Sequence, residues 1–401
     1  MKLGDLLPHV QFNIDELNNF MVKLHGPGAG RGNVALVFKL RDGGDIKDAT
    51  ANGVDAVLGH QLTTLWLPSP QSTLETPDTV IQRSIESHWN SYVSVGRFAG
   101  DQRKSEQSTW IPGAWADLDV KPSLECGFAT SDELDAFIET IAPPTLVVDS
   151  GSGGRHPYWL LEGEGMSDPK KAREMMARWR SLLLVKAREI GRKVDLGVFD
   201  LARILRLPGT PRHPKLARYE TVTTSRPVRL LVDDGPRYSP DDIAALTKRA
   251  HGLVGRQQRE HRRLRNEDTK TRLEGMKARG LSETMYCDVI RVFEETQDWA
   301  PLLLTTGWTL DSDNREREGS TAARYWIRPG KTAGGSADTD FNGSNVMFVF
   351  SDDPSLDDLF VGPRDGVQNV VGKYRYALVR LYHGDEVRLI KDIITGGGKV
   401  L

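Results

Sequence analysis

Two aspartates one residue apart are the first side chains in this sequence whose type and spacing suggest chemistry. Asp117 and Asp119 lie in the run Trp-Ala-Asp-Leu-Asp-Val at residues 115–120. Residues i and i+2 of an extended strand point to the same face, so the two carboxylates would converge. Such oxygen ligands favour Mg²⁺ or Mn²⁺, whereas zinc would require Cys and His ligands. The alternative is a solvated edge strand that binds no metal.

A loop of small residues provides the second set of candidates. The run Asp-Ser-Gly-Ser-Gly-Gly-Arg-His occupies residues 149–156 between two apolar segments. Small residues let backbone N–H groups approach an anion closely, and Ser152, Arg155 and His156 add donors at the same loop. This chemistry suits a phosphate group. The alternative is that His156 is a structural histidine at the start of a strand.

The third set of candidates follows in the segment Val-Asp-Leu-Gly-Val-Phe-Asp-Leu-Ala-Arg-Ile-Leu-Arg-Leu-Pro-Gly-Thr at residues 194–210. If Asp195 or Asp200 joins the first two aspartates, three carboxylates could hold two divalent ions at a phosphoryl-transfer site. Arg203 and Arg206 could then bind phosphate through bidentate contacts. The alternative is a helix N-terminus and a turn with surface arginines.

The elements that must position these residues alternate between short β-rich runs and helical patterns. The β-rich runs are residues 33–40, 91–100, 114–120, 144–151 and 156–162, and the clearest helical pattern covers residues 169–190. This alternation predicts an α/β fold, with an α+β mixed sheet, for the first domain. In the helix, Met175, Met176, Trp179, Leu182, Leu183 and Ile190 recur at helical spacing, and core packing accounts for all of them.

A basic segment separates this domain from the rest of the chain. Residues 248–279 contain eleven Lys and Arg against four acidic residues, a net charge of +7, although the whole chain has a net charge of −2. Arg259, Arg262, Arg263 and Arg265 could attract phosphate backbones, and the alternative is a solvated helical linker. We therefore expect a domain over residues 1–245, a basic helical linker over 246–280 and a small α+β accessory domain over 281–401.

Composition excludes several classes of protein. The 401 residues are 38% hydrophobic and 27% charged, which is typical of a globular protein. With only Cys126 and Cys287, the chain has neither a disulfide framework nor a zinc cysteine cluster, and we expect both thiols to be buried. No Walker A motif is present. No signal peptide or membrane span is evident, so we expect a cytoplasmic protein that does not bind membranes.

Taken in order, the three motifs D-x-D, S-G-G-R-H and D-x₄-D-x₂-R-x₂-R-L-P-G-T resemble those of the archaeo-eukaryotic primase superfamily. The resemblance covers about residues 30–220 and is closest to the primase-polymerase domains of phage and plasmid replication proteins. It implies a metal site at Asp117, Asp119 and Asp195, with Asp200 as the alternative third ligand. It also implies nucleotide binding by Ser152, Arg155 and His156. Asp195 is favoured because the run up to L-P-G-T-P-R-H-P-K then aligns with the family pattern without a gap.

The resemblance implies a template-dependent nucleotidyltransferase, a DNA primase and DNA polymerase with two Mg²⁺ or Mn²⁺ ions. Its partners would be nucleoside triphosphates, a single-stranded DNA template and a helicase in cis or in trans, in the host cytoplasm if the protein is phage-encoded. The region from residue 281 is similar to the segment that joins such domains to a helicase, so the chain could be part of a longer primase-helicase. Two alternatives are a non-catalytic replication initiator that binds DNA through the basic segment and a metal-dependent glycosyltransferase that uses the D-x-D pair.

Overall fold

The computed structural model describes residues 13–39, 63–67, 90–122, 127–213, 225–311, 324–332, 335–340, 344–349, 351, 353–361 and 370–401. The chain divides into two compact units, Met1–Leu253 and Val254–Leu401. Within the described residues, no helix is long and apolar enough to cross a membrane.

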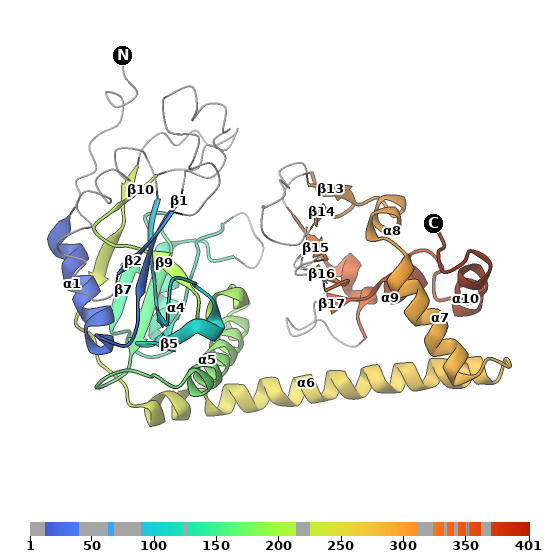
Figure 1. Cartoon of the computed structure of the whole chain (residues 1–401), viewed down its shortest axis with the longest axis horizontal. Coiled ribbons are helices and arrows are strands. Elements are labelled where there is room, and N and C mark those ends of the chain that lie inside the picture. The colour runs from blue at the N-terminus through green and yellow to red at the C-terminus, as the bar shows by residue number, and fades with distance from the viewer. Residues whose placement is uncertain are drawn as a thin grey trace, which may run out of the picture. The chain divides into compact units, whose positions relative to one another are not determined.

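The first unit contains two four-stranded sheets (Figure 1). One sheet has the order β2-β1-β3-β9 and consists of β1 (Val34–Lys39), β2 (Thr63–Leu67), β3 (Asn90–Ser94) and β9 (Ile204–Arg206). The other has the order β12-β7-β8-β6 and consists of β6 (Gly113–Trp115), β7 (Leu146–Asp149), β8 (Arg155–Leu160) and β12 (Arg229–Val232). Two short pairs complete the strands: β4 (Arg97–Phe98) with β5 (Ser108–Trp110), and β10 (Pro211–Arg212) with β11 (Arg226–Pro227).

The pairing of these strands differs from the sequence-based expectation. Helices and strands are combined as predicted, but every ladder between the described strands is antiparallel, so the expected mixed sheet was wrong. The connection between β7 and β8 explains one such pairing, because it spans only residues 150–154. A parallel pair would need a crossover of about a dozen residues or more.

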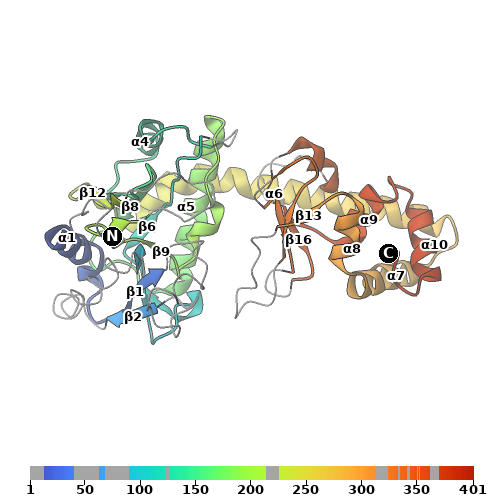
Figure 2. The same ribbon diagram turned by 90° about the horizontal axis from the view of Figure 1, so that it is seen from above.

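The described part of the first unit includes the helices α1 (Ile14–His25), α4 (Ser131–Glu139) and α5 (Pro169–Glu189). Figures 1 and 2 show α1 and α5 on opposite sides of the strands. The structure confirms the helix predicted over residues 169–190. Asp168 caps it by accepting hydrogen bonds from Lys170 N and Lys171 N, and Pro169 occupies its first turn. Ile190 lies beyond the last helical residue and is exposed, so its predicted core position was wrong.

Both sheets and all three helices bury side chains in one core. Among the largest buried side chains are Trp115 on β6, Trp159 on β8 and Trp179 on α5. The rings of Trp159 and Trp179 lie 4.7 Å apart, which packs α5 against the sheet that contains β8. This packing fixes the strands that position the candidate site.

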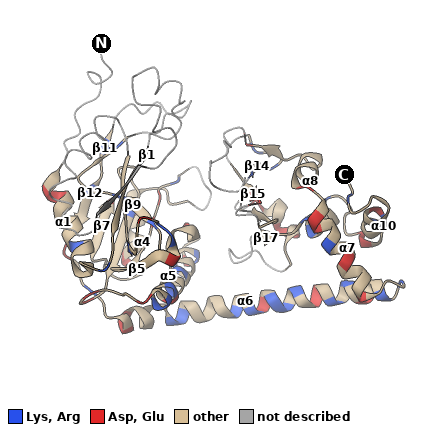
Figure 3. Cartoon of the chain, in the orientation of Figure 1, with Lys and Arg blue, Asp and Glu red and all other residues tan. Residues whose placement is uncertain are grey.

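The boundary between the two units falls within α6 (Pro240–Lys277), a continuous helix of 38 residues. The predicted basic segment lies almost entirely in this helix. Figure 3 shows basic and acidic residues interspersed along it.

The second unit combines helices with a five-stranded antiparallel sheet. The helices are α7 (Glu283–Thr296), α8 (Trp299–Thr305), α9 (Lys373–Arg380) and α10 (Glu386–Thr395). The sheet order is β13 (Thr309–Leu310), β14 (Arg324–Ile327), β15 (Ala337–Thr339), β16 (Met347–Val349) and β17 (Val370–Val371). In Figures 1 and 2, α7, α9 and α10 lie on one side of this sheet.

A buried carboxylate in the second unit links α10 to α6, α7 and α9. Glu386 at the start of α10 accepts hydrogen bonds of 2.6 Å from the Tyr286 hydroxyl and 2.9 Å from the Tyr374 hydroxyl. Arg272 on α6 lies 3.3 Å from the same carboxylate oxygen. Cys287, next to Tyr286, is exposed, so its predicted burial was wrong: α7 turns this position away from the core. Cys126 lies outside the described residues.

Candidate active site

Asp117 and His156 stand opposite each other on neighbouring extended segments. The β6–β8 ladder pairs Trp115 with Tyr158, and its register continues beyond the end of β6. Leu118 and Arg155 exchange two backbone hydrogen bonds, of 2.9 and 2.8 Å. Asp117 is therefore directly opposite His156, and the two side chains leave the same face of the sheet. Asp117 Oδ1 lies 3.3 Å from His156 Nε2.

The surroundings of Asp117 favour its ionised form. Burial raises the pKa of this carboxyl, but the His156 ring, Arg203 and Lys121 together outweigh burial, so the pKa lies below its usual value. The hydroxyl of Tyr158 is buried on the same face and has no partner among the described residues. Burial and the charge of Asp117 both raise the pKa of Tyr158, which keeps this hydroxyl protonated.

Asp119 extends the same face and binds a cation of the chain itself. Leu118, between the two aspartates, is buried, so its side chain lies on the face opposite the two carboxylates, as the sequence predicted. Lys121 Nζ lies 2.9 Å from Asp119 Oδ2. Burial lowers the pKa of Lys121, but the charges of Asp119, Asp195 and Asp117 outweigh it and raise the pKa above its usual value. One ammonium group thus interacts with all three acidic residues that the sequence motifs singled out.

Sequence analysis missed Lys121, although a signal for it was present. Lys121 is two residues after Asp119 in the same extended run, so alternation places it on the face of the two carboxylates. A lysine at this spacing is a natural counter-ion.

The two alternative third ligands have different surroundings. Asp195 caps the short helix η6 (Leu196–Phe199) by accepting a hydrogen bond of 2.8 Å from Gly197 N. Asp200, at the other end of η6, lies 2.7 Å from Arg203. Trp115 Nε1 donates a hydrogen bond of 2.9 Å to the carbonyl of Val198, which anchors this segment to β6. Asp195 is the one of the two that interacts with Lys121.

The side chains at this site are of the types that bind a divalent cation. Asp117, Asp119 and Asp195 offer the oxygen donors that Mg²⁺ and Mn²⁺ prefer, and the ammonium of Lys121 already places a positive charge among them. In the described part of the chain, no group of three or more His, Cys, Asp or Glu side chains is arranged to hold a metal ion. Asp119 and Asp195 are exposed and Asp117 is half-buried, so a metal site would require these side chains to change position.

The 150–154 loop carries a row of backbone N–H donors. Ser150 N donates to the carbonyl of Gly154 at 3.0 Å, and Gly151 N donates to Asp149 Oδ1 at 2.7 Å. Among the described residues, none accepts a hydrogen bond from the backbone N–H of Ser152, Gly153 or Gly154. With Gly151 and Gly153 at φ values of 75° and 88°, the loop has the alternating conformation of an anion-binding nest.

Close packing requires glycine in this loop. A Cβ at Gly154 would lie 2.7 Å from the carbonyl oxygen of Leu118, in the run that carries the two aspartates. A Cβ at Gly151 would lie 2.9 Å from Cβ of Arg212. The loop therefore packs between the acidic run and β10, the strand that follows the third motif.

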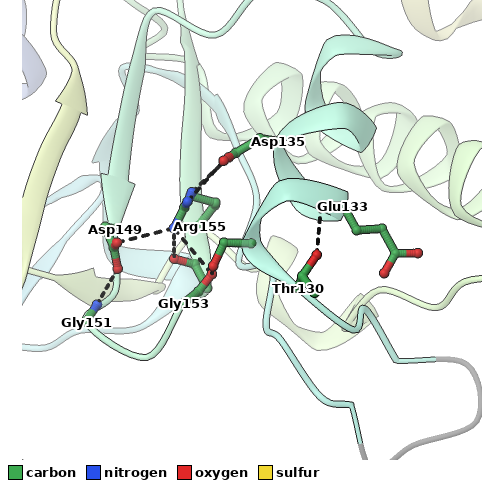
Figure 4. Close-up of polar contacts among 9 residues, drawn as sticks. Thr130, Glu133, Asp135, Asp149, Gly151, Gly153 and Arg155 are labelled. Carbon is green, nitrogen blue, oxygen red and sulfur yellow. Dashed lines mark hydrogen bonds and ion pairs between the residues drawn. The ribbon is translucent and has the colours of Figure 1, made fainter.

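His156 and Arg155 are neighbours in sequence but point to opposite faces of β8. His156 is buried, and its Nδ1 has no partner among the described residues. Arg155 turns away from it towards Asp135 on α4 and Asp149 on β7 (Figure 4). The structure thus brings His156, but not Arg155, to the face of Asp117.

Arg203 and Arg206 are held by different partners. Arg203 donates to Asp200 and to the carbonyl of Gly197, and its charge influences Asp117. Arg206 donates to Asn90 Oδ1 at 2.9 Å and stacks 5.1 Å from the ring centre of Tyr92. Arg203 is therefore the one of the two that the structure brings into electrostatic contact with the acidic residues.

The four arginines predicted to bind DNA lie on α6. Arg259, Arg262 and Arg265 are exposed. Arg263 is also exposed, but it lies 2.5 Å from Glu260 and 2.6 Å from Glu267. Side chains three and four residues apart on a helix are neighbours, so these two glutamates largely balance the charge of Arg263.

Comparisons with known proteins add three partial similarities. No protein-family model and no curated protein matches the chain. The AEP domain of the cyanophage S-2L primase-polymerase is similar at 16% identity and a TM-score of 0.40, over 59% of this chain and 99% of that domain. The primase RepB′ is similar at 14% identity and a TM-score of 0.36, over 64% of this chain and 69% of that one. The catalytic domain of RepB′ in complex with initiator DNA is similar at 14% identity and a TM-score of 0.36, over 61% and 98%.

Proposed function

We propose that the chain is a template-dependent nucleotidyltransferase, a DNA primase and DNA polymerase of phage or plasmid replication. The observation that carries the proposal is that Asp117 lies 3.3 Å from His156, where the 150–154 loop ends, while Lys121 pairs with Asp119 at 2.9 Å and is also influenced by the charges of Asp117 and Asp195. A set of carboxylates beside a row of unpaired backbone donors suits a nucleoside triphosphate with its divalent ions.

The residues of the site have distinct roles in this proposal. Asp117, Asp119 and Asp195 would hold Mg²⁺ or Mn²⁺, with Asp200 as the alternative third ligand; the ions supply charge stabilisation for the transferring phosphoryl group. The N–H groups of the loop, Ser152 and His156 bind the phosphates of the incoming nucleotide. The 3′-hydroxyl of the growing chain then attacks the α-phosphate, its proton passes to solvent, and the bond to the β-phosphate breaks so that pyrophosphate leaves. Alignment of the two reactants is the main contribution of the fold.

Asp195 is the better third ligand of the two candidates. Asp200 already pairs with Arg203 at 2.7 Å, whereas the charge of Asp195, like those of the other two aspartates, raises the pKa of Lys121. Arg203 is close enough to influence Asp117 and would meet the negative charge of a bound triphosphate. Arg206 is assigned the same role, although its guanidinium is bound to Asn90.

Template binding is assigned to α6. Arg259, Arg262 and Arg265 would attract the phosphates of single-stranded DNA, and Arg263 contributes less because Glu260 and Glu267 hold it. We retain residues 1–245 as the catalytic domain, 246–280 as the basic segment and 281–401 as an accessory domain that works with a helicase in cis or in trans. The site of action would be the cytoplasm of a bacterial host.

An incorporation assay distinguishes this function from the other two readings of the motifs. Purified chain is incubated with an unlabelled single-stranded DNA template, labelled nucleoside triphosphates and Mg²⁺ or Mn²⁺. A nucleotidyltransferase yields products complementary to the template. A replication initiator binds the DNA but incorporates no nucleotide, and a glycosyltransferase consumes nucleotide sugars instead.

A further inference from the structure

We propose that Arg155 is a positioning residue, which with Asp135 fixes the 150–154 loop from the face opposite His156 and makes no contact with the nucleotide. The proposal rests on nucleotide binding at this loop, as put forward above. It replaces the direct phosphate contact that the sequence motif suggests for Arg155.

All three guanidinium nitrogens of Arg155 are already engaged. Nε and Nη2 bind the two carboxylate oxygens of Asp135 at 2.8 and 3.0 Å, a bidentate pair. Nη1 lies 3.3 Å from Asp149 Oδ2 and donates to the carbonyls of Gly153 and Gly154 at 3.3 and 3.4 Å. The side chain is 8% exposed. Figure 4 shows the guanidinium between Asp135 and Asp149.

The charge at this point does not favour a phosphate group. One guanidinium is paired with two carboxylates, so the cluster carries a net negative charge. A phosphate would have to displace Asp135 from its bidentate pair with the buried guanidinium of Arg155. In addition, strand alternation sends Arg155 and His156 to opposite faces, so one phosphate cannot contact both.

The same contacts determine which way the loop presents its donors. Arg155 Nη1 and Ser131 Oγ both donate to the carbonyl of Gly153, the latter at 2.9 Å. The C=O and N–H of one peptide unit point in opposite directions. Holding the Gly153 carbonyl towards Arg155 therefore turns the N–H of Gly154 to the other side of the loop. The Gly154 carbonyl, held by Arg155 and Ser150 N, is fixed in the same way.

Helix α4 supplies the rigid support. Thr130 caps it by accepting a hydrogen bond of 3.2 Å from Glu133 N, and Leu134, Phe137 and Ile138 bury its apolar side. Asp135 and Ser131 project from this anchored helix to the loop. The nest is thus shaped by a helix that carries no residue of the three motifs.

The variant Asp135→Asn distinguishes the two possible roles of Arg155, because they predict opposite changes in nucleotide affinity. If Arg155 contacts phosphate, Asp135→Asn frees its charge and nucleotide affinity stays equal or increases. If Arg155 positions the loop, Asp135→Asn and Arg155→Lys both weaken affinity. We expect about a tenfold rise in Kd for each, which corresponds to about 1.4 kcal/mol. The double variant loses little more, because both changes break the same contact.

The experiment measures binding of a non-hydrolysable nucleoside triphosphate to the full chain by titration calorimetry, and steady-state incorporation on a DNA template. We expect KM for the nucleotide to rise with Kd while kcat at saturating nucleotide stays within about twofold. A general loss of folded protein would instead lower kcat. Glu139→Gln, an exposed acid on the same helix, is the matched control and should leave both constants unchanged.

Unchanged or tighter binding by Asp135→Asn contradicts the positioning role. If that variant does not fold, Ser131→Ala provides the test, because it removes only the hydrogen bond to the Gly153 carbonyl. This variant should weaken nucleotide binding a few-fold. Unchanged nucleotide binding by Ser131→Ala would contradict the proposal. His156→Ala is measured in parallel. If it too leaves affinity unchanged, nucleotide binding at this loop is wrong; if it alone weakens binding, only the role of Arg155 is wrong.

Discussion

Asp117 Oδ1 and His156 Nε2 lie 3.3 Å apart, across two extended segments that share one register. This contact joins the first motif to the second, which lie far apart in the chain. It places the histidine beside the acidic residues, with its remaining ring nitrogen buried and without a partner among the described residues. A buried polar atom of this kind normally has a partner, so a ligand or a local rearrangement would complete its bonding.

Replacement of His156 tests the nucleotide-binding role of this contact. His156→Ala should weaken nucleoside triphosphate binding by about 1.5–3 kcal/mol, the cost of losing a charge-assisted hydrogen bond. Titration calorimetry gives the affinity, and thermal melting gives the stability. Unchanged affinity together with a much lower melting temperature would show that His156 is a structural histidine.

The identity of the third acidic ligand can be tested with a matched pair of variants. Asp195→Ala should abolish incorporation, because it removes the third carboxylate of the proposed metal site, whose charge acts on Lys121 together with those of Asp117 and Asp119. Asp200→Ala should only weaken it, because that carboxylate orients Arg203. Incorporation is measured at saturating template and nucleotide. The reverse ranking would assign the ligand to Asp200.

Lys121 should compete with metal for the acidic residues. Removing a unit charge about 4 Å away in a solvent-exposed site changes the interaction by about 1 kcal/mol. Lys121→Met should therefore bind Mn²⁺ about fivefold more tightly, as measured by electron paramagnetic resonance of free Mn²⁺. Lys104→Met, at an exposed lysine, is the control. Equal Mn²⁺ affinity in the two variants would show that Lys121 does not occupy the cation position.

The arginines of α6 should determine how template binding depends on salt. Each phosphate contact contributes about 0.7 to the slope of log affinity against log salt for single-stranded DNA. Changing Arg259, Arg262, Arg263 and Arg265 to Ala together should flatten the slope by about 2. Three contacts are counted, because Glu260 and Glu267 hold Arg263.

Catalysis at saturating template should survive the fourfold change, since these residues lie outside the three motifs. Arg263→Ala alone serves as the internal control and should change the slope little. A slope unchanged by the fourfold replacement would falsify the DNA-contact role and leave α6 as a solvated helix.

The sequence allowed the local features of the site to be predicted but not the pairing between its segments. Alternation in the run around Leu118 predicted a shared face for the two aspartates, and the glycines predicted a loop open to anions. The register that sets Asp117 opposite His156 depends on long-range strand pairing, which no local pattern specifies.

Two departures from the predicted contacts, at Arg155 and at Arg263, have the same origin. Arg155 follows a phosphate-type loop, yet strand alternation and the carboxylate of Asp135, twenty residues earlier, direct it to the other face. Arg263 is part of a basic run, yet the acids one helical turn away on either side balance it. In both cases a partner outside the motif determines what the charged side chain contacts.

The central claim is that the aspartate pair serves nucleotide transfer. Its most direct test is primer extension on a DNA template with Mg²⁺ or Mn²⁺, comparing the natural chain with Asp117→Asn and Asp119→Asn, and with the exposed Asp101→Asn as control. We expect template-complementary extension by the natural chain and the control. Asp117→Asn and Asp119→Asn should each lower the rate of primer extension by about 1000-fold or more, which corresponds to a loss of about 4 kcal/mol of transition-state stabilisation. Their melting temperatures should not change. Full activity of the doubly substituted chain would contradict the claim.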